Sequence, residues 1–170
     1  MEYTIKMTEE LKVEDLKGLI SRGAVRPGDE ITAGGYMWRV LDIREDRILI
    51  WKHTGVEDHV FNEDNTNVYE GSDIQKYLQT EFRETVPEEL LSMVDDEGFF
   101  LLTLEQIRKY LPKEIDRIAE DPDGYATWWW TSTPNVGSGS TVRYIHPSGY
   151  ANSNHASNSY GVAPACWLTI

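Results

Sequence analysis

The last quarter of the chain sets a long polar segment between two apolar ones, and this arrangement restricts most strongly how the chain can fold. Three consecutive tryptophans, Trp128–Trp130, precede a run dominated by Ser, Asn, Gly, Thr, Tyr and His, and the apolar residues 162–168 follow it. A flexible Ser/Asn-rich linker would not end in an apolar strand. The sequence therefore predicts a polar surface that is held between two core strands.

The polar run has the composition of an antibody binding loop. Tyr offers a large contact area at a low conformational-entropy cost, and Ser, Gly and Asn offer adaptable hydrogen bonds. From Thr127 to Ile170 there is no Asp or Glu, so all 29 acidic residues lie before this region. We interpret the chain as a charged, solubilising body that displays a nearly neutral binding surface. The predicted ligand-binding residues are Trp129, Thr131, Tyr144, His146, Ser148, Tyr150, Asn152, Asn154, His155, Ser157, Asn158 and Tyr160.

The charge and the cysteine count exclude several classes of function. A net charge of −13 disfavours nucleic-acid partners, which require Lys/Arg patches. Cys166 is the single cysteine, so no disulfide can form within the chain, and its apolar neighbours predict a buried thiol. The spacing of His53, His59, His146 and His155 matches no common zinc pattern, so we expect no metal and no cofactor.

No apolar run reaches transmembrane length, and the first residues lack the features of a signal peptide. We therefore expect synthesis in the cytoplasm without membrane insertion, and assembly onto a phage particle or a surface stays open. The acidic segment with Glu57, Asp58, Glu63 and Asp64 lacks the spacing of an EF-hand and is interpreted as solvated surface.

Periodicity predicts an early β-meander, then helices, and then a strand-rich end. The expected helices are 8–22, 72–82, a short one after Pro87, and 104–111, with Thr8, Ser72 and Thr103 as N-caps. The expected strands are 31–32, 36–43, 47–51, 99–102, 128–132, 141–146 and 161–168, with residues 52–71 and 113–126 irregular. This order is typical of an α+β domain in which the helices are segregated from antiparallel sheets.

We expect two parts. Residues 1–26 form an N-terminal helical segment that packs on or leads into the domain, because its helix has an apolar face. Residues 27–170 form the ligand-binding domain. In the strand 128–132, Trp129 must point opposite to Trp128 and Trp130, and we expect Trp128 to be a sheet anchor.

Several short motifs occur in a characteristic order in residues 27–170. They include residues 36–41 (YMWRVL), 69–82 (YEGSDIQKYLQTEF), 99–103 (FFLLT), 129–132 (WWTS) and 161–168 (GVAPACWL). The set resembles a bacterial and phage domain family of unassigned function, with the patterns W-R-V-L, W-x-x-S-x-L-R-x-W-L-N-x-x-F, F-L-L-S, W-W-L-R-S-P and G-V-R-P-A-L-W-L. That family resembles the C-type-lectin-like fold, so the resemblance implies a scaffold for ligand display. Here Tyr69 stands at the first Trp of the second pattern, and Ala163 at the Arg of the last.

Residues 144–160 resemble the variable proteins of diversity-generating retroelements. In those systems, adenines in Asn codons of a template are randomised, which cannot produce Lys, Glu, Gln, Met or Trp. From Thr131 to Gly161 the chain contains none of these five residue types. The resemblance implies a hypervariable surface near the C-terminus.

Together these features predict a non-catalytic recognition module, a variable protein whose ligand is a protein such as a cell-surface receptor, or a glycan. Two alternatives stay open. One is a carbohydrate-binding lectin-like module, because Trp and Tyr stack on sugar rings. The other is an enzyme similar to formylglycine-generating oxidases, which would use Cys166 as its nucleophile.

Overall fold

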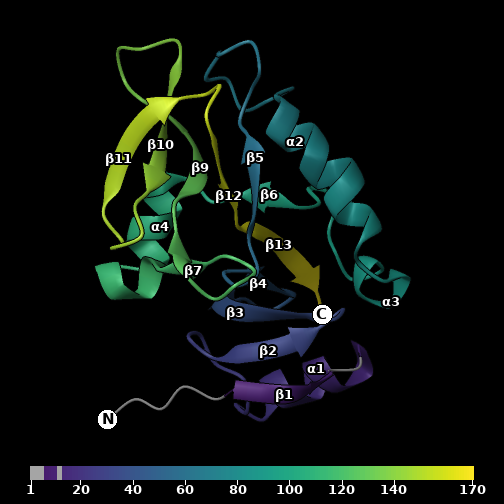
Figure 1. Cartoon of the computed structure of the whole chain (residues 1–170). Helices are drawn as coiled ribbons and strands as arrows, with labels where there is room; N and C mark the ends of the chain where they lie inside the picture. The colour runs from purple at the N-terminus through teal and green to yellow at the C-terminus, as the bar shows by residue number, and fades with distance from the viewer. Residues whose placement is uncertain (1–5, 11–12) are drawn as a thin grey trace.

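The computed structural model describes residues 6–10 and 13–170, and in them it shows two sheets with short helices packed against them (Figure 1). The six-stranded sheet has the spatial order β1 (Lys6–Glu10), β2 (Glu30–Ala33), β3 (Tyr36–Ile43), β4 (Arg47–Trp51), β13 (Pro164–Thr169) and β6 (Phe100–Leu101). The five-stranded sheet has the order β11 (Ala151–His155), β10 (Thr141–Ile145), β9 (Trp129–Pro134), β12 (Ser159–Val162) and β5 (Glu57–Val60). The pairs β1–β2 and β12–β9 are parallel and the other pairs in these two sheets are antiparallel, so the predicted α+β class is confirmed.

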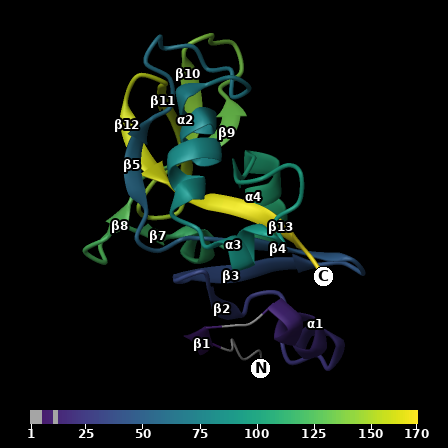
Figure 2. The same ribbon diagram turned by 90° about the vertical axis from the view of Figure 1, so that its right-hand side faces the viewer.

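The helices α2 (Asp73–Tyr77) and α4 (Leu104–Tyr110) pack on opposite sides of the five-stranded sheet, whereas α1 (Val13–Ser21) lies beside β1 and β2 (Figures 1 and 2). Ile74 and Leu78 share a core cluster with Trp130, and Leu104 and Ile107 share a second cluster with Trp129. The remaining elements are the π-helix η1 (Leu78–Phe82), α3 (Glu88–Leu91), the 3₁₀-helix η2 (Glu114–Arg117), and the strand pair β7 (Ala119–Glu120) and β8 (Ala126–Thr127). No helix in the described part of the chain is long and apolar enough to cross a membrane.

The meander β2–β3–β4 confirms the predicted early strands. Gly34 and Gly35 form its first turn with φ values of 62° and 79°, which glycine adopts without a Cβ penalty. Ile48 and Ile50 lie in one core cluster and Leu49 lies in the other, so β4 is buried on both faces. The sheet is therefore the centre of both cores.

Two predicted helix starts are confirmed by their caps. The Ser72 side chain accepts a hydrogen bond from the backbone N–H of Gln75 at the start of α2. Thr103 and Gln106 form a reciprocal capping box at the start of α4. These local bonds satisfy backbone donors that have no partner within the helix, which is why both starts could be read from the sequence.

The predicted helix 8–22 is wrong in its first turns. Thr8 lies in β1, which pairs in parallel with β2, and the helix begins at Val13. Leu11, which we assigned to the apolar face, lies outside the described residues. The pairing of β1 with β2, in which Lys6 lies opposite Glu30 and Glu10 opposite Thr32, takes the place of the expected first helical turn. Leu16 and Val25 are buried in the first core cluster.

Three further predictions need correction in the second sheet. Residues 52–71 are not wholly irregular, because they contain β5. The segment 161–168 forms two strands, β12 and β13, which leave one sheet and enter the other at Ala163. The polar loop expected between residues 147 and 160 contains β11. β5 and β13 depend on partners that are distant in the chain, so local periodicity did not reveal them. β11 pairs with the preceding strand β10, but its Ser and Asn residues gave no strand signal.

Candidate functional site

The hairpin β10–β11 places even-numbered and odd-numbered residues on opposite faces of the five-stranded sheet. Tyr144 lies opposite Asn152, and Val142 lies opposite Asn154. His146 donates its backbone N–H to the carbonyl of Tyr150 at 2.8 Å, so the pairing extends toward the turn. Because side chains alternate across a strand, the even-numbered residues of the hairpin share one face of the sheet.

Tyr160 of β12 is the centre of this face. Its ring centroid lies 4.8 Å from that of Trp130 and 4.9 Å from that of Tyr144, and it stacks on Trp128 at 6.2 Å. Each aromatic pair of this kind contributes about 0.5–1.5 kcal/mol beyond its buried area. We define the aromatic face as Trp128, Tyr144, His146, Tyr150, Asn152, Asn154 and Tyr160.

His146 and Tyr150 form the end of the aromatic face that is nearest the hairpin turn. Their rings stack with centroids 4.2 Å apart and an interplanar angle of 14°, and the His146 ring meets Trp128 edge-on at 6.0 Å. The backbone N–H of Ser148 donates to Nδ1 of His146 at 3.1 Å. Nδ1 is therefore an acceptor, and the ring proton of neutral His146 is on Nε2.

An amide network fixes the other end of the aromatic face. The Asn154 side chain donates to the Tyr160 hydroxyl at 2.7 Å and accepts from the side chain of Asn158 at 2.8 Å. Oδ1 of Asn154 also accepts the backbone N–H of His155, and Oδ1 of Asn152 accepts the backbone N–H of Ser153, both at 2.8 Å. β11 is the edge of its sheet, so these asparagines also occupy N–H groups that an added strand would need.

The turn of the hairpin is held against η2. Gly149 has φ 95°, and a Cβ at this position would overlap the backbone carbonyl of Glu114. The guanidinium group of Arg117 donates a hydrogen bond to the backbone carbonyl of Gly149 at 3.4 Å. The backbone beneath His146 and Tyr150 is therefore supported from a separate element.

Two predicted binding residues do not reach the surface. Trp129 is fully buried, packs on Trp51 with ring centroids 5.2 Å apart, and donates from Nε1 to the carbonyl of Arg117. Thr131 is also fully buried, and its hydroxyl donates to the carbonyl of Arg143 at 2.8 Å. Both are on the side of β9 that is covered by α4, so they do not belong to the predicted ligand-binding surface.

The alternation of the three tryptophans is as predicted, but the sides were assigned wrongly. Trp128 and Trp130 both contact Tyr160, whereas Trp129 belongs to the opposite core cluster. Trp128 is 42% exposed and is not a buried anchor. The exposed tryptophan of the site is therefore Trp128.

The remaining predicted residues lie around the aromatic face. Ser148 is exposed in the hairpin turn, and His155 is exposed on the other side of β11, opposite Thr141. Ser157 and Asn158 are exposed in the turn before β12, where the Ser157 backbone N–H donates to Oδ1 of Asn65. Tyr144 is nearly buried, so it contributes little area of its own.

Sequence reasoning missed two residues that extend the face. Tyr160 pairs across β12–β5 with His59, whose ring lies 4.6 Å from that of Tyr77 in α2. Both rings are half-buried. Neither could be found from sequence spacing, because β5 was not recognised and its partner strand is about a hundred residues away.

The electrostatics of the aromatic face are nearly neutral. Burial, then the neighbouring hydroxyls of Tyr160 and Tyr150, raises the pKa of Tyr144, so this phenol stays protonated. The nearest strand with carboxylates is β5, where burial and then Asp121 and Glu57 raise the pKa of Asp58. Uncharged hydrogen-bonding groups therefore dominate the face.

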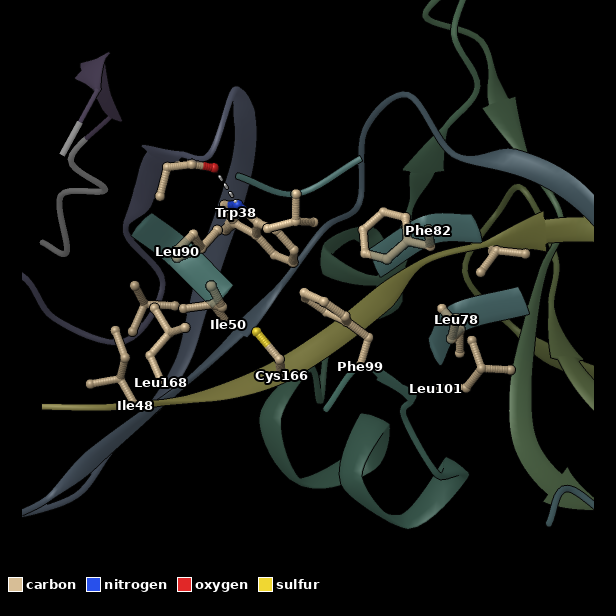
Figure 3. Packing of buried hydrophobic residues seen from close by; sticks show 14 of the residues in the cluster. Trp38, Ile48, Ile50, Leu78, Phe82, Leu90, Phe99, Leu101, Cys166 and Leu168 are labelled. Atoms are coloured by element: carbon tan, nitrogen blue, oxygen red, sulfur yellow. Dashed lines mark hydrogen bonds between the residues drawn. The ribbon is translucent and has the colours of Figure 1, made fainter. Parts of the chain in front are cut away.

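The environment of Cys166 disfavours a role of its thiol as a nucleophile. Its thiol is fully buried between Ile50, Phe99 and Trp38 (Figure 3), and this burial raises its pKa far above the usual range. A reactive cysteine needs an accessible thiolate. In the described residues, no group of three or more His, Cys, Asp or Glu side chains could hold a metal ion.

Comparison with known proteins gives one family match. A model described as "Domain of unknown function (DUF6273)" matches residues 90–170, a little under half of the chain. This range contains the whole aromatic face but excludes His59 and Tyr77. The searches among curated proteins and among solved structures returned no match.

Proposed function

We propose that this chain is a non-catalytic recognition module that binds a protein partner through the aromatic face. The main support is geometric. Side chains at alternate positions from Tyr144 to Asn154 share one face of a hairpin, together with Trp128 and Tyr160 from two other strands. The residues that the polar run contributes thus form one surface with distant tryptophan and tyrosine side chains.

The chemistry of this face supports a protein ligand over a phosphate-bearing one. Trp and Tyr are enriched among the residues that contribute most to protein–protein affinity, and Asn offers both donors and acceptors. Trp128 is 42% exposed and Tyr150 is 41% exposed, so two large rings are accessible. Their contacts to His146 hold them in position, which lowers the entropy lost on binding.

We further propose that the scaffold is C-type-lectin-like and that the chain is a variable protein of a diversity-generating retroelement. Two mainly antiparallel sheets with short helices support such a scaffold. Several polar side chains between residues 148 and 158 are exposed, so their identity can change at little cost to folding. These are Ser148, Tyr150, Asn152, His155, Ser157 and Asn158.

A binding experiment tests the recognition surface. A partner is first selected by capture from surface-protein extracts with the intact chain and is then identified and purified. The triple variant Trp128→Ala, Tyr150→Ala, Asn152→Ala should lose at least about a hundredfold in affinity, because each aromatic anchor contributes about 2 kcal/mol. A matched control replaces exposed Val68, Tyr125 and Val136, none of which belongs to the aromatic face. Equal affinity of both triple variants would contradict the proposal.

The DNA around the gene tests whether the aromatic face and its adjoining turn are diversified by a retroelement. A variable protein of this class requires a near-copy of the segment encoding roughly residues 128–168, which differs almost only at template adenines, and a nearby reverse-transcriptase gene. Absence of the near-copy would overturn the proposed diversification. The recognition proposal would then stand as an ordinary module with one fixed partner.

A glycan ligand is the second candidate. The observation that favours it is the exposed ring of Trp128 beside the stacked pair His146 and Tyr150, with Asn152 on the same face. Such rings stack on sugars while amides bond to hydroxyl groups. A glycan array separates the two candidates, because a single saccharide class bound through Trp128 would favour the lectin-like module. The enzyme alternative is weakened by the buried thiol, and modification of Cys166 in the folded chain would revive it.

A further inference from the structure

A hollow of about 630 Å³ lies between α4 and the loop that joins β9 to β10. Its lining includes Leu104 and Arg108 of α4, Val136 of the loop, and Arg143 of β10. Arg143 has the same parity in β10 as Ile145, which belongs to the core cluster of α4. The hollow is therefore on the side of the sheet opposite the aromatic face.

The charges in this hollow contrast with those of the rest of the chain. Two guanidinium groups, those of Arg108 and Arg143, line it with a single carboxylate, that of Glu105. In the part of the chain that the structure describes, neither guanidinium forms an ion pair. The chain as a whole has a net charge of −13, so a local excess of positive charge is unusual here.

Arg143 also has an unsatisfied donor. Its Nε atom is buried and has no hydrogen-bond partner among the described residues. Buried donors are nearly always paired, because an unpaired one loses its bonds to water without replacement. A ligand in the hollow can therefore engage this guanidinium without breaking a hydrogen bond within the described chain.

We propose that this hollow binds a small organic carboxylate with an aliphatic body. A guanidinium presents parallel N–H donors that match the two oxygens of a carboxylate. Leu104 and Val136 supply apolar walls, and Val136 is 96% exposed, so an aliphatic chain laid against it would remove apolar surface from water. The inference is independent of the proposed recognition function, because it uses the opposite side of the sheet.

The test uses 4-methylpentanoate as the probe and ¹H–¹⁵N NMR of the full chain as the readout. For a ligand of this size we expect a dissociation constant on the order of 1 mM. The shifts should concentrate at the amides of Leu104, Thr133 and Val136 and at the Nε–H of Arg143. The neutral isostere 4-methylpentanamide, acetate and inorganic phosphate should each bind at least about tenfold more weakly, since each lacks the charge or the apolar body.

Two variants assign the effect to the arginines. Arg143→Met and Arg108→Met keep an apolar stem, and each should weaken 4-methylpentanoate binding by about tenfold. Arg22→Met, at an exposed arginine of the N-terminal segment, should leave it unchanged. If Arg143→Met does not fold, the exposed Arg108 decides the assignment alone. No saturable shift up to about 10 mM, equal binding of the amide, or unchanged binding in Arg108→Met would overturn the proposal.

Discussion

The two sheets of this protein differ in how completely the faces of their strands are buried. The strands β3, β4 and β13 of the six-stranded sheet bury side chains on both faces, with Val40 and Cys166 in one core cluster and Leu41 and Trp167 in the other. In the five-stranded sheet, β10 and β11 bury one side against α4 and leave Tyr150 and Asn152 exposed on the other. The five-stranded sheet buries its second side only in part: Trp130 and Val142 belong to the core cluster of α2, whereas the outer strand β11 leaves its side chains there exposed to solvent.

The largest expected difference in the free energy of unfolding is between substitutions of the neighbouring residues Trp128 and Trp129. Trp129→Ala should lower the free energy of unfolding by about 3–5 kcal/mol, because it empties a buried site against Trp51. Trp128→Ala, the matched control, should cost about 1 kcal/mol because its ring is partly in water. Urea denaturation measures both, and equal losses would contradict the assignment of the two sides.

A buried histidine at the end of β4 should make folding sensitive to acid. Burial, then the positive charge of Arg39, lowers the pKa of His53 to about 4, although Glu30 lies 3.3 Å away. The unfolded chain takes up this proton near pH 6.5 and the folded chain only near pH 4. The contribution of neutral His53 to folding stability is therefore fully present above about pH 6.5, and it is lost as the pH falls from about 6.5 to about 4.

The expected loss from this group is about 2.5 kcal/mol between pH 7.5 and pH 4.5. The measurement is urea denaturation of the natural chain and of His53→Gln at both pH values. The variant should lose less stability on acidification, by about the stated amount. An identical pH dependence in both proteins would show that the pKa of His53 is the same in the folded and unfolded chains.

The hairpin turn beneath the aromatic face should tolerate less change than its exposure suggests. Gly149→Ala should destabilise the chain by about 2 kcal/mol, because the new Cβ meets the Glu114 carbonyl and φ is positive. Gly139→Ala is the control, since a Cβ there meets nothing within 4 Å. Thermal denaturation compares the two, and an unchanged melting temperature for Gly149→Ala would mean that the turn is not held against η2.

The sequence predicted which residues gather near the surface better than it predicted how they are arranged. Tyr144, Tyr150 and Asn152 were all chosen, but the residues after 146 were expected to form a loop, so their alternation on one face of the β10–β11 hairpin was not predicted. Which side of β9 is covered depends on α4 and on Trp51, which are distant in the chain, so Trp129 and Thr131 were assigned to the wrong side. The pairing of Tyr160 with His59 likewise joins segments that no local pattern connects.

The smallest expected effect on stability is at the exposed residues of the aromatic face and its adjoining turn. Asn152→Tyr, Ser157→Tyr and Asn158→Tyr each use a residue type that adenine-directed variation can produce, and each should change the free energy of unfolding by at most about 0.5–1 kcal/mol. Asn152 and Asn158 lose single exposed hydrogen bonds, which contribute little beside water.

Thr131→Tyr is the matched control for these three changes. The same new side chain would enter a fully buried position and displace the hydrogen bond to the Arg143 carbonyl, so we expect it to prevent folding. Circular dichroism melting of the four variants gives the comparison directly. If the three surface variants unfold as readily as Thr131→Tyr, the aromatic face contributes to the fold as the six-stranded sheet does, and its side chains are not free to vary for binding.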